Sequence, residues 1–210
     1  MTKLAIIILV RNNPNQVVKL HETMTKWADV ETDFYVVECG TKKDKLSGIH
    51  SFYADWPFAI ENGLRYPRGI NFALEHIHLN GKLKEYDAIM FLNSDVVVPH
   101  KAFLSVLLRI LDKNPKLGII SPSSAAWGET LLLGKNNLRC FWHIHNNALV
   151  FRREALLDLL NFAEPNHMGF LFDGHNFHGF CCELEVISKA YLNGWAAAIT
   201  SEVFIERDSE

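Results

Sequence analysis

Apolar runs alternate with amphipathic segments along the first 121 residues of the chain. Continuous apolar stretches predict strands buried on both faces, whereas apolar residues three or four positions apart predict helices. The predicted strands cover residues 4–10, 33–38, 51–53, 87–92 and 117–121, the last of them closed by Pro122. One predicted helix begins at Pro14, a second runs from Pro67 until Gly81 stops it, and a third covers residues 100–112. This alternation is typical of an α/β fold with a Rossmann-like, mostly parallel sheet flanked by helices.

The pattern becomes less regular after Pro122. Residues 121–137 are polar and predict a loop region. Further along, the pattern predicts a strand over 148–151, helices over 153–162 and 183–192, and two short strands over 195–200 and 203–205. No repeat and no linker rich in Pro, Gly or Ser divides the 210 residues, so we expect a single domain.

The apolar strand over residues 87–92 ends abruptly in the polar corner Asn93-Ser94-Asp95. Ligands of open parallel sheets bind at the carboxyl ends of the strands, so we expect the chemistry of this protein at that corner. The competing interpretation is a plain turn, because Asn, Ser and Asp favour turns through local hydrogen bonds.

Composition narrows the classes of function. The formal net charge is −3 and there is no block of Lys or Arg, which argues against nucleic acid as the main partner. The four cysteines lack paired spacing, which argues against a disulfide framework or a zinc ribbon and favours a reducing, cytoplasmic location. No apolar run is long enough to cross a bilayer, and the first run enters Arg11 without a cleavage site, as expected for a strand rather than a signal peptide.

Several short motifs resemble, in their order along nearly the whole chain, those of the inverting glycosyltransferases of family two, which have the GT-A fold. These motifs are Arg11-Asn12-Asn13-Pro14, Val36-Val37-Glu38-Cys39-Gly40-Thr41, Pro67-Arg68-Gly69-Ile70-Asn71, Leu92-Asn93-Ser94-Asp95-Val96, Leu149-Val150-Phe151-Arg152 and Cys182-Glu183-Leu184-Glu185. In that family the corner usually reads Asp-x-Asp. This chain has Asn93 in the first position, which resembles a rhamnosyltransferase-like subgroup. The resemblance implies one GT-A domain over residues 1–210, in which 1–121 bind a nucleotide sugar and 122–210 bind the acceptor.

The resemblance also implies a nucleotide-sugar donor, most simply a UDP-sugar, and Mn²⁺ or Mg²⁺ to neutralise its diphosphate, since hard cations take oxygen ligands. It makes Asp95 a metal ligand, with Asn93 and Glu206 as further metal ligands. The implied donor-binding residues are Val10, Asn12 and Glu38 for the nucleoside, Arg65, Arg68 and Asn71 at a helix start for the diphosphate, and Asn93 and Ser94 beside them. The competing interpretations are a solvated strand end for Glu38 and surface ion pairs for the arginines.

An inverting transferase needs a carboxylate base that takes the proton of the acceptor hydroxyl. By its position in the motif, Glu183 matches the catalytic carboxylate that the resemblance implies. Glu185, two residues later, does not share a helix face with Glu183, and an acidic residue in a first helical turn is commonly favoured by the helix dipole. Asp173 in Phe172-Asp173-Gly174 is a rival base on a predicted loop.

Histidines gather late in the chain. His143 and His145 would share a face of a strand, and His175 and His178 a face of a helix, so a transition-metal site is one interpretation. We favour an acceptor pocket, in which aromatic rings stack on sugar faces; ordinary core packing is the alternative. The candidate rings are Trp127, Phe141, Trp142, Phe177 and Phe180.

The sequence therefore predicts transfer of a hexose or deoxyhexose, of glucose or rhamnose type, to a glycan hydroxyl with inversion. A nucleotidyltransferase is an alternative, but the Arg11-Asn12-Asn13-Pro14 turn has none of the glycines that such an enzyme needs after its first strand. The other alternative is a non-catalytic carbohydrate- or nucleotide-binding protein with a degenerate GT-A fold, because Asn93 and Cys182 depart from the family pattern. The chain is expected to be either a compact enzyme or a module of a larger multi-domain transferase.

Overall fold

The computed structural model describes residues 3–99, 101–124 and 128–207, and it contains one sheet in the order β3-β2-β1-β4-β8-β6-β9-β5, with β7 paired to β9. The strands are β1 (Lys3–Val10), β2 (Glu31–Glu38), β3 (Phe52–Tyr53), β4 (Ala88–Asn93), β5 (Val96–Val97), β6 (Leu117–Ser124), β7 (Leu138–Cys140), β8 (Ala148–Arg152) and β9 (Ala196–Arg207). The expected α/β fold with its mostly parallel sheet is confirmed.

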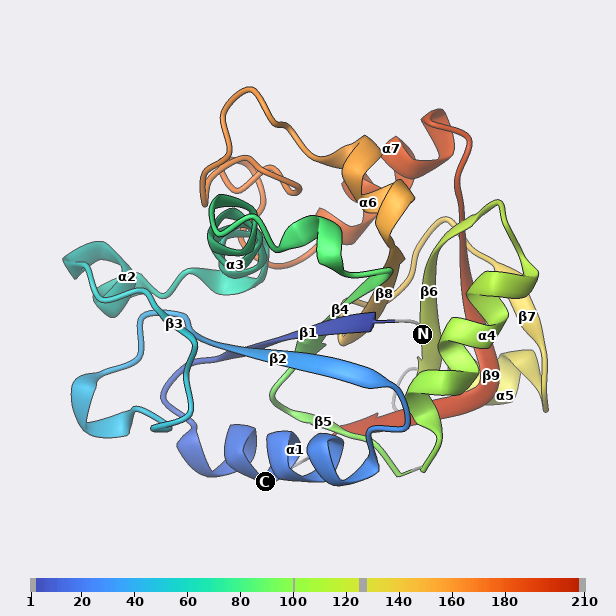
Figure 1. Cartoon of the computed structure of the whole chain (residues 1–210), viewed down its shortest axis with the longest axis horizontal. Helices are drawn as coiled ribbons and strands as arrows, with labels where there is room; N and C mark the ends of the chain where they lie inside the picture. Colours follow the sequence, from blue (N-terminus) through green and yellow to red (C-terminus); the bar gives the residue numbers. More distant parts are fainter. Residues whose placement is uncertain (1–2, 100, 125–127, 208–210) are drawn as a thin grey trace.

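Two layers of helices cover the faces of the sheet (Figure 1). One core lies under α1 (Pro14–Trp27) and α4 (Phe103–Lys113), and the other lies under α2 (Pro57–Asn62), α3 (Arg65–Leu79), α6 (Arg153–Leu159) and α7 (Cys182–Leu192). The remaining helical segments are α5 (Glu129–Leu133) and the single turns η1 (Lys43–Lys45) and η2 (Leu83–Glu85). The central strand β1 is buried from Leu4 to Val10, which explains its continuous apolar sequence.

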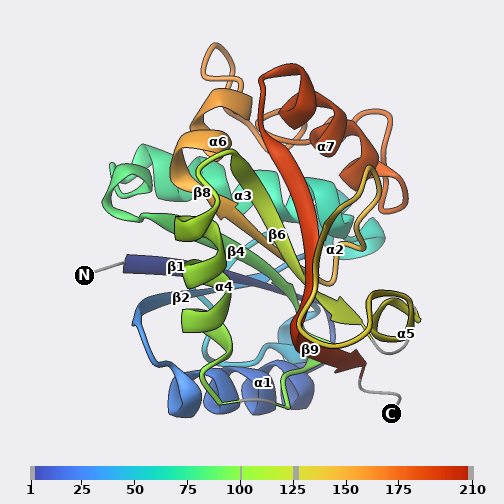
Figure 2. The same ribbon diagram turned by 90° about the vertical axis from the view of Figure 1, so that its right-hand side faces the viewer.

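The strands that carry polar ends all meet at one edge of the sheet. β1 is parallel to β2 and β4, and β6 is parallel to β9, whereas β8 lies antiparallel between β4 and β6. The carboxyl ends of β1, β4, β6 and β9 therefore reach the same edge, where β8 begins (Figure 2). This edge is where ligands of such sheets bind.

Helix α3 packs close to the sheet and brings its first turn to this edge. A Cβ atom on Gly69 would lie 2.8 Å from the Cys39 Sγ atom and 3.1 Å from a Leu9 methyl group, so only glycine allows this approach. The first residue of the helix, Arg65, has a φ of 61°, a conformation that is costly for a residue with a side chain. The first turn of α3 thus lies beside the ends of β1 and β2.

Several elements differ from the sequence prediction. Strand β6 continues through Pro122 to Ser124. Pro122 lies beyond the last residue that pairs with β8, and the register against β9 shifts directly after the Pro122–Thr200 pair, so the missing N–H falls at an irregularity of the ladder. The predicted loop over 121–137 contains part of β6 and helix α5, and the two short C-terminal strands are one strand, β9, with a register shift against β6. Strand β7 and helix α2 were not predicted.

The histidine segments also differ from their predicted secondary structure. Residues 143–145 lie in a loop rather than a strand, and residues 175–178 form a turn followed by a bend rather than a helix. The segment between α6 and α7 is therefore irregular and depends on side-chain contacts for its shape. Among the described residues, no helix is both long enough and apolar enough to span a membrane.

Candidate active site

Two adjoining cavities open at the carboxyl edge of the sheet. The strand-end cavity, of about 430 Å³, is lined by Leu9, Val10, Arg11, Cys39, Arg65, Tyr66, Asn93, Ser94 and Asp95. The histidine cavity, of about 620 Å³, is lined by Arg65, Tyr66, His143, His145, Asn146, Asn176, Phe177, His178, Gly179, Phe180 and Glu183. Arg65 and Tyr66 belong to both linings, so the first turn of α3 forms the wall that the two cavities share.

The corner after β4 is fixed by its backbone. The Asn93 N–H donates to the Asn147 carbonyl (3.0 Å), and the Ser94 N–H donates to the Leu9 carbonyl (3.2 Å). Asp95 is the carboxylate among the residues that line the strand-end cavity, and its Oδ2 atom accepts a hydrogen bond from the Arg207 Nε (2.8 Å). The sequence prediction missed Arg207, which arrives from the far end of the chain on β9.

Among the described residues, Glu206 makes no hydrogen bond or ion pair to Asn93, Ser94 or Asp95. It pairs with Val97 in the sheet, its side chain is exposed, and consecutive strand residues point to opposite faces, so the residue next to Arg207 points away from Asp95. The described residues contain no group of three or more His, Cys, Asp or Glu side chains placed to hold a metal ion. Asp95 and the amide oxygen of Asn93 are the oxygen ligands that this corner offers, which fits a cation held together with substrate oxygens rather than an all-protein cage.

The residues predicted to bind a nucleoside have different surroundings. Val10 lines the strand-end cavity. The Asn12 Oδ1 atom accepts a hydrogen bond from the Lys42 N–H (2.9 Å). Glu38 is fully buried, and its carboxylate accepts hydrogen bonds from the Thr41 Oγ1 (2.5 Å) and the Ser47 N–H (2.8 Å). Glu38 is therefore neither a solvated strand end nor a lining residue, because it holds the loop that follows β2.

The helix start separates the predicted diphosphate ligands into two groups. Arg65 is exposed, lines both cavities and has no hydrogen-bond or ion-pair partner in the part of the chain that the structure describes. Arg68 is buried and donates from Nε to the Gly174 carbonyl (2.7 Å). Asn71 is fully buried and makes four hydrogen bonds to backbone groups of His167, Leu171 and Phe172. Neither Arg68 nor Asn71 lines the two cavities.

Glu183 is the carboxylate among the residues that line the histidine cavity. It lies in the first turn of α7, it is buried, and its Oε1 atom is 3.2 Å from the His143 Nε2. A buried carboxylate beside an imidazole, open to a cavity on one side, is suited to accept a proton from a ligand hydroxyl.

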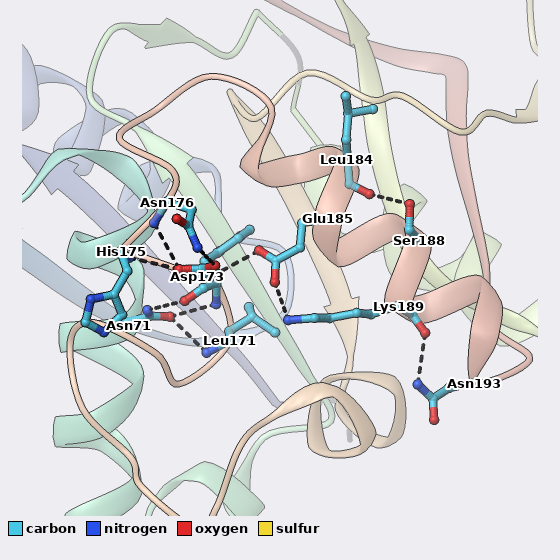
Figure 3. A network of polar contacts seen from close by, with 11 residues as sticks. Asn71, Leu171, Asp173, His175, Asn176, Leu184, Glu185, Ser188, Lys189 and Asn193 are labelled. Carbon is cyan, nitrogen blue, oxygen red and sulfur yellow. Dashed lines mark hydrogen bonds and ion pairs between the residues drawn. The ribbon is translucent and has the colours of Figure 1, made fainter.

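Glu185 and Asp173 belong to a separate polar network (Figure 3). Glu185 accepts from the Asp173 N–H (3.0 Å) and forms an ion pair with Lys189. Hydrogen bonds from the Asn176 side chain and from backbone N–H groups hold the pKa of Asp173 below its usual value. Both carboxylates line a third cavity, of about 470 Å³, and neither lines the cavity that contains Glu183.

His145 is buried, and its Nε2 atom lies 3.0 Å from the Glu129 Oε2 and 3.4 Å from the Ser121 Oγ. A hydrolase triad needs the acid and the hydroxyl on opposite ring nitrogens, whereas here both face the same one, and the Nδ1 atom accepts the Asn147 N–H. His145 is therefore a structural member of the cavity wall.

The predicted aromatic residues divide in the same way. Phe177 and Phe180 line the histidine cavity, and Trp142, which is 74% exposed, lies beside His143 with ring centroids 6.0 Å apart. Phe141 packs against the core, and Trp127 lies outside the described residues. The aromatic surface at the mouth of the cavity is therefore made by residues near His143 and His178.

Tyr66 was not predicted. Its hydroxyl group is buried and has no hydrogen-bond partner among the described residues, although the side chain contributes to the wall between the cavities. Burial, with Cys182 and Glu183 nearby, raises its pKa well above the usual value, so the phenol is a donor. Buried polar groups without partners are rare in folded proteins, so the Tyr66 hydroxyl is a candidate donor to a bound ligand.

A scan against models of protein families found no match, and a sequence search of curated proteins found none either. The structure is similar to solved structures of sugar transferases. Mannosyltransferase PcManGT from Pyrobaculum calidifontis, in complex with GDP-Man and Mn²⁺, has a TM-score of 0.68 and 12% identity, over 99% of this chain and 57% of that one.

Two further structures give the same result. Glucosyl-3-phosphoglycerate synthase from Mycobacterium tuberculosis, in complex with Mg²⁺ and UDP, has a TM-score of 0.59 and 14% identity, over 100% of this chain and 72% of that one. TarS 1–349 from S. aureus has a TM-score of 0.64 and 13% identity, over 98% of this chain and 60% of that one. The chain thus spans less than two thirds of the mannosyltransferase and of TarS. These likenesses show the fold, which is the GT-A fold that the motifs predicted.

Proposed function

We propose that this protein is a glycosyltransferase that moves a hexose or deoxyhexose from a nucleotide diphosphate sugar to a hydroxyl group of a glycan, with inversion. The observation that carries the proposal is the pair of adjoining cavities. The strand-end cavity contains Asp95 at the edge where α/β sheets bind ligands, and the histidine cavity contains Glu183 as its carboxylate. The sugar that is transferred would lie at the shared wall of Arg65 and Tyr66.

The donor is proposed to occupy the strand-end cavity. Solved proteins of the same fold bind GDP-Man with Mn²⁺ or UDP with Mg²⁺, and we propose a UDP-sugar here. Val10, Asn93 and Ser94 would contact the nucleotide, and Arg65 would bind its diphosphate, because its guanidinium is exposed and unpaired among the described residues. We include a sugar of rhamnose type in this proposal because Asn93 resembles the corner of the rhamnosyltransferase-like subgroup.

A divalent cation fits Asp95 and Asn93 if the diphosphate supplies further oxygen ligands. Such a cation would neutralise the charge that the leaving group gains. The protein's own contribution is to hold the diphosphate with Asp95 through that cation and with Arg65 directly, and to present the sugar to the histidine cavity.

The chemical step requires one base. The acceptor oxygen attacks the anomeric carbon, the bond from that carbon to the diphosphate oxygen breaks, and the acceptor proton passes to Glu183. The products are the glycoside, the nucleoside diphosphate and a protonated Glu183, so atoms and charges balance. His143, 3.2 Å from Glu183, orients the carboxylate, and Phe177 and Phe180 would contact the acceptor sugar.

The first experiment compares Glu183→Gln with Glu185→Gln. A screen of UDP-sugars for hydrolysis and transfer should show activity in the wild type, a loss of about 10²–10⁴-fold in Glu183→Gln, and a much smaller effect in Glu185→Gln. UDP binding should persist in both variants. The anomeric configuration of the product, measured by NMR, tests inversion.

Equal losses in the two variants would contradict the assignment of the base. Nucleotide binding without any turnover in the wild type would support a non-catalytic binding protein of the same fold instead.

A further inference from the structure

The strand-end cavity has a single carboxylate among its lining residues, and that carboxylate is already paired. The Arg207 Nε donates to the Asp95 Oδ2 at 2.8 Å. This oxygen is one of the two that Asp95 can offer to a cation. A guanidinium within hydrogen-bond distance of the same oxygen repels a divalent cation, so the two compete for Asp95.

The backbone of Arg207 is held in the sheet, while its side chain is exposed. Arg207 pairs with Val96 at the end of β9, and the strand is anchored in the core by the buried side chains of Val203 and Ile205. The Arg207 side chain is 61% exposed, whereas that of Asp95 is 26% exposed. Because exposed ion pairs are weak, the guanidinium can leave Asp95 without disturbing the sheet.

We infer that Arg207 is an internal counter-ion which a divalent cation must displace from Asp95, so that the corner binds Mn²⁺ or Mg²⁺ tightly only together with a nucleoside diphosphate. The diphosphate supplies anionic oxygens to the cation, and the same oxygens give the displaced guanidinium a new partner. Without the diphosphate, the cation has one carboxylate and must compete with Arg207 for it. This inference rests on the proposed function only in its second part, the role of the diphosphate.

The test measures binding of MnCl₂ alone, by EPR of free Mn²⁺ and by calorimetry. The variants are Arg207→Gln, Arg207→Lys and Asp95→Asn, and the matched control is Arg109→Gln, which removes an exposed arginine paired with Glu202 on the same strand β9. We expect Arg207→Gln to bind Mn²⁺ at least fivefold more tightly than the wild type. Arg207→Lys and Arg109→Gln should stay close to the wild type, and Asp95→Asn should bind more weakly.

The second arm adds UDP at saturating concentration. We expect UDP to tighten Mn²⁺ binding strongly in the wild type and much less in Arg207→Gln, because the counter-ion has already gone. Mn²⁺ binding in Arg207→Gln that equals or falls below the wild-type value, with thermal unfolding unchanged, would overturn the inference. Tighter Mn²⁺ binding in Arg207→Gln, with no effect of UDP in either protein, would support Arg207 as the counter-ion of Asp95. The same result would count against the proposed donor site.

Discussion

At the scale of single residues, what a polar side chain already binds decides whether it is available to a ligand. Arg65 and Arg68 are three positions apart on α3, yet Arg65 faces both cavities and Arg68 is buried against the Gly174 carbonyl. Glu183 and Glu185 are separated in the same way, since one lines the histidine cavity and the other is paired with Lys189. In each pair, one side chain lines a cavity and the other is held by contacts within the fold.

Asn71 provides the clearest test of a structural role. Its Oδ1 atom accepts the N–H groups of Leu171 and Phe172, and its Nδ2 atom donates to two backbone carbonyls. Asn71→Ala leaves these buried groups without partners, so we expect a loss of about 3 kcal/mol in the free energy of unfolding. Urea titration measures it, with the exposed Asn62→Ala as a control that should cost less than about 1 kcal/mol. A change below 1 kcal/mol in Asn71→Ala would contradict the structural role.

At the scale of elements, the irregular segment between α6 and α7 is held by side chains of α3 in addition to its own turn hydrogen bonds. The Asn71 side chain binds the backbone of three residues of this segment, and the Arg68 side chain binds the backbone of Gly174. His167, in the same segment, packs against the Trp56 ring with centroids 5.3 Å apart. The walls of both the histidine cavity and the third cavity depend on this segment.

His167 makes the stability of this segment depend on pH. Burial, followed by the nearby Arg68, lowers the pKa of His167 below its usual value of 6.5. The unfolded chain therefore binds a proton that the folded chain does not, and this contribution destabilises the protein as the pH falls below 6.5. We expect the urea midpoint to fall between pH 7.5 and pH 5.5, and to fall less in His167→Gln. At pH 8 His167 is neutral in the folded and the unfolded chain, so the difference between the wild type and His167→Gln then reports only the packing of the ring. An identical fall in both proteins would contradict the assignment.

The sequence pattern predicted where long strands and helices lie better than it predicted which elements pack beside one another. Buried strands such as β1 and β4 are apolar along their whole length, so their pattern is strong, and α7 begins within one residue of its prediction. Pro122 was interpreted as a strand end, but β6 continues past it, because β8 no longer pairs there and the register against β9 shifts directly after Pro122. Short elements such as α2 and β7 carry too few residues for a periodic signal.

At the scale of the whole molecule, the site is assembled from distant parts of the chain. β1, β4, β6 and β9 end at one edge, and β8 begins there. The motifs predicted Asp95 and Glu183 because each lies within a short recognisable segment. Nothing local indicates that Arg207 reaches Asp95 across 112 residues, or that the Tyr66 hydroxyl is buried without a partner among the described residues. The pairing of β5 with β9 decides the first, and the packing of α3 against Phe172 and the start of α7 decides the second.

The measurement that tests the central claim most directly is a calorimetric titration of UDP, with GDP and dTDP in parallel, in Mn²⁺, Mg²⁺ or EDTA. The proteins are the wild type, Asp95→Ala and the control Glu206→Ala, which removes an exposed carboxylate on the neighbouring strand. We predict nucleotide binding that requires the divalent cation, weakens at least tenfold in Asp95→Ala and is unchanged in Glu206→Ala. Absence of binding by all three nucleotides, or equal binding in Asp95→Ala, would contradict a donor site at the strand-end cavity.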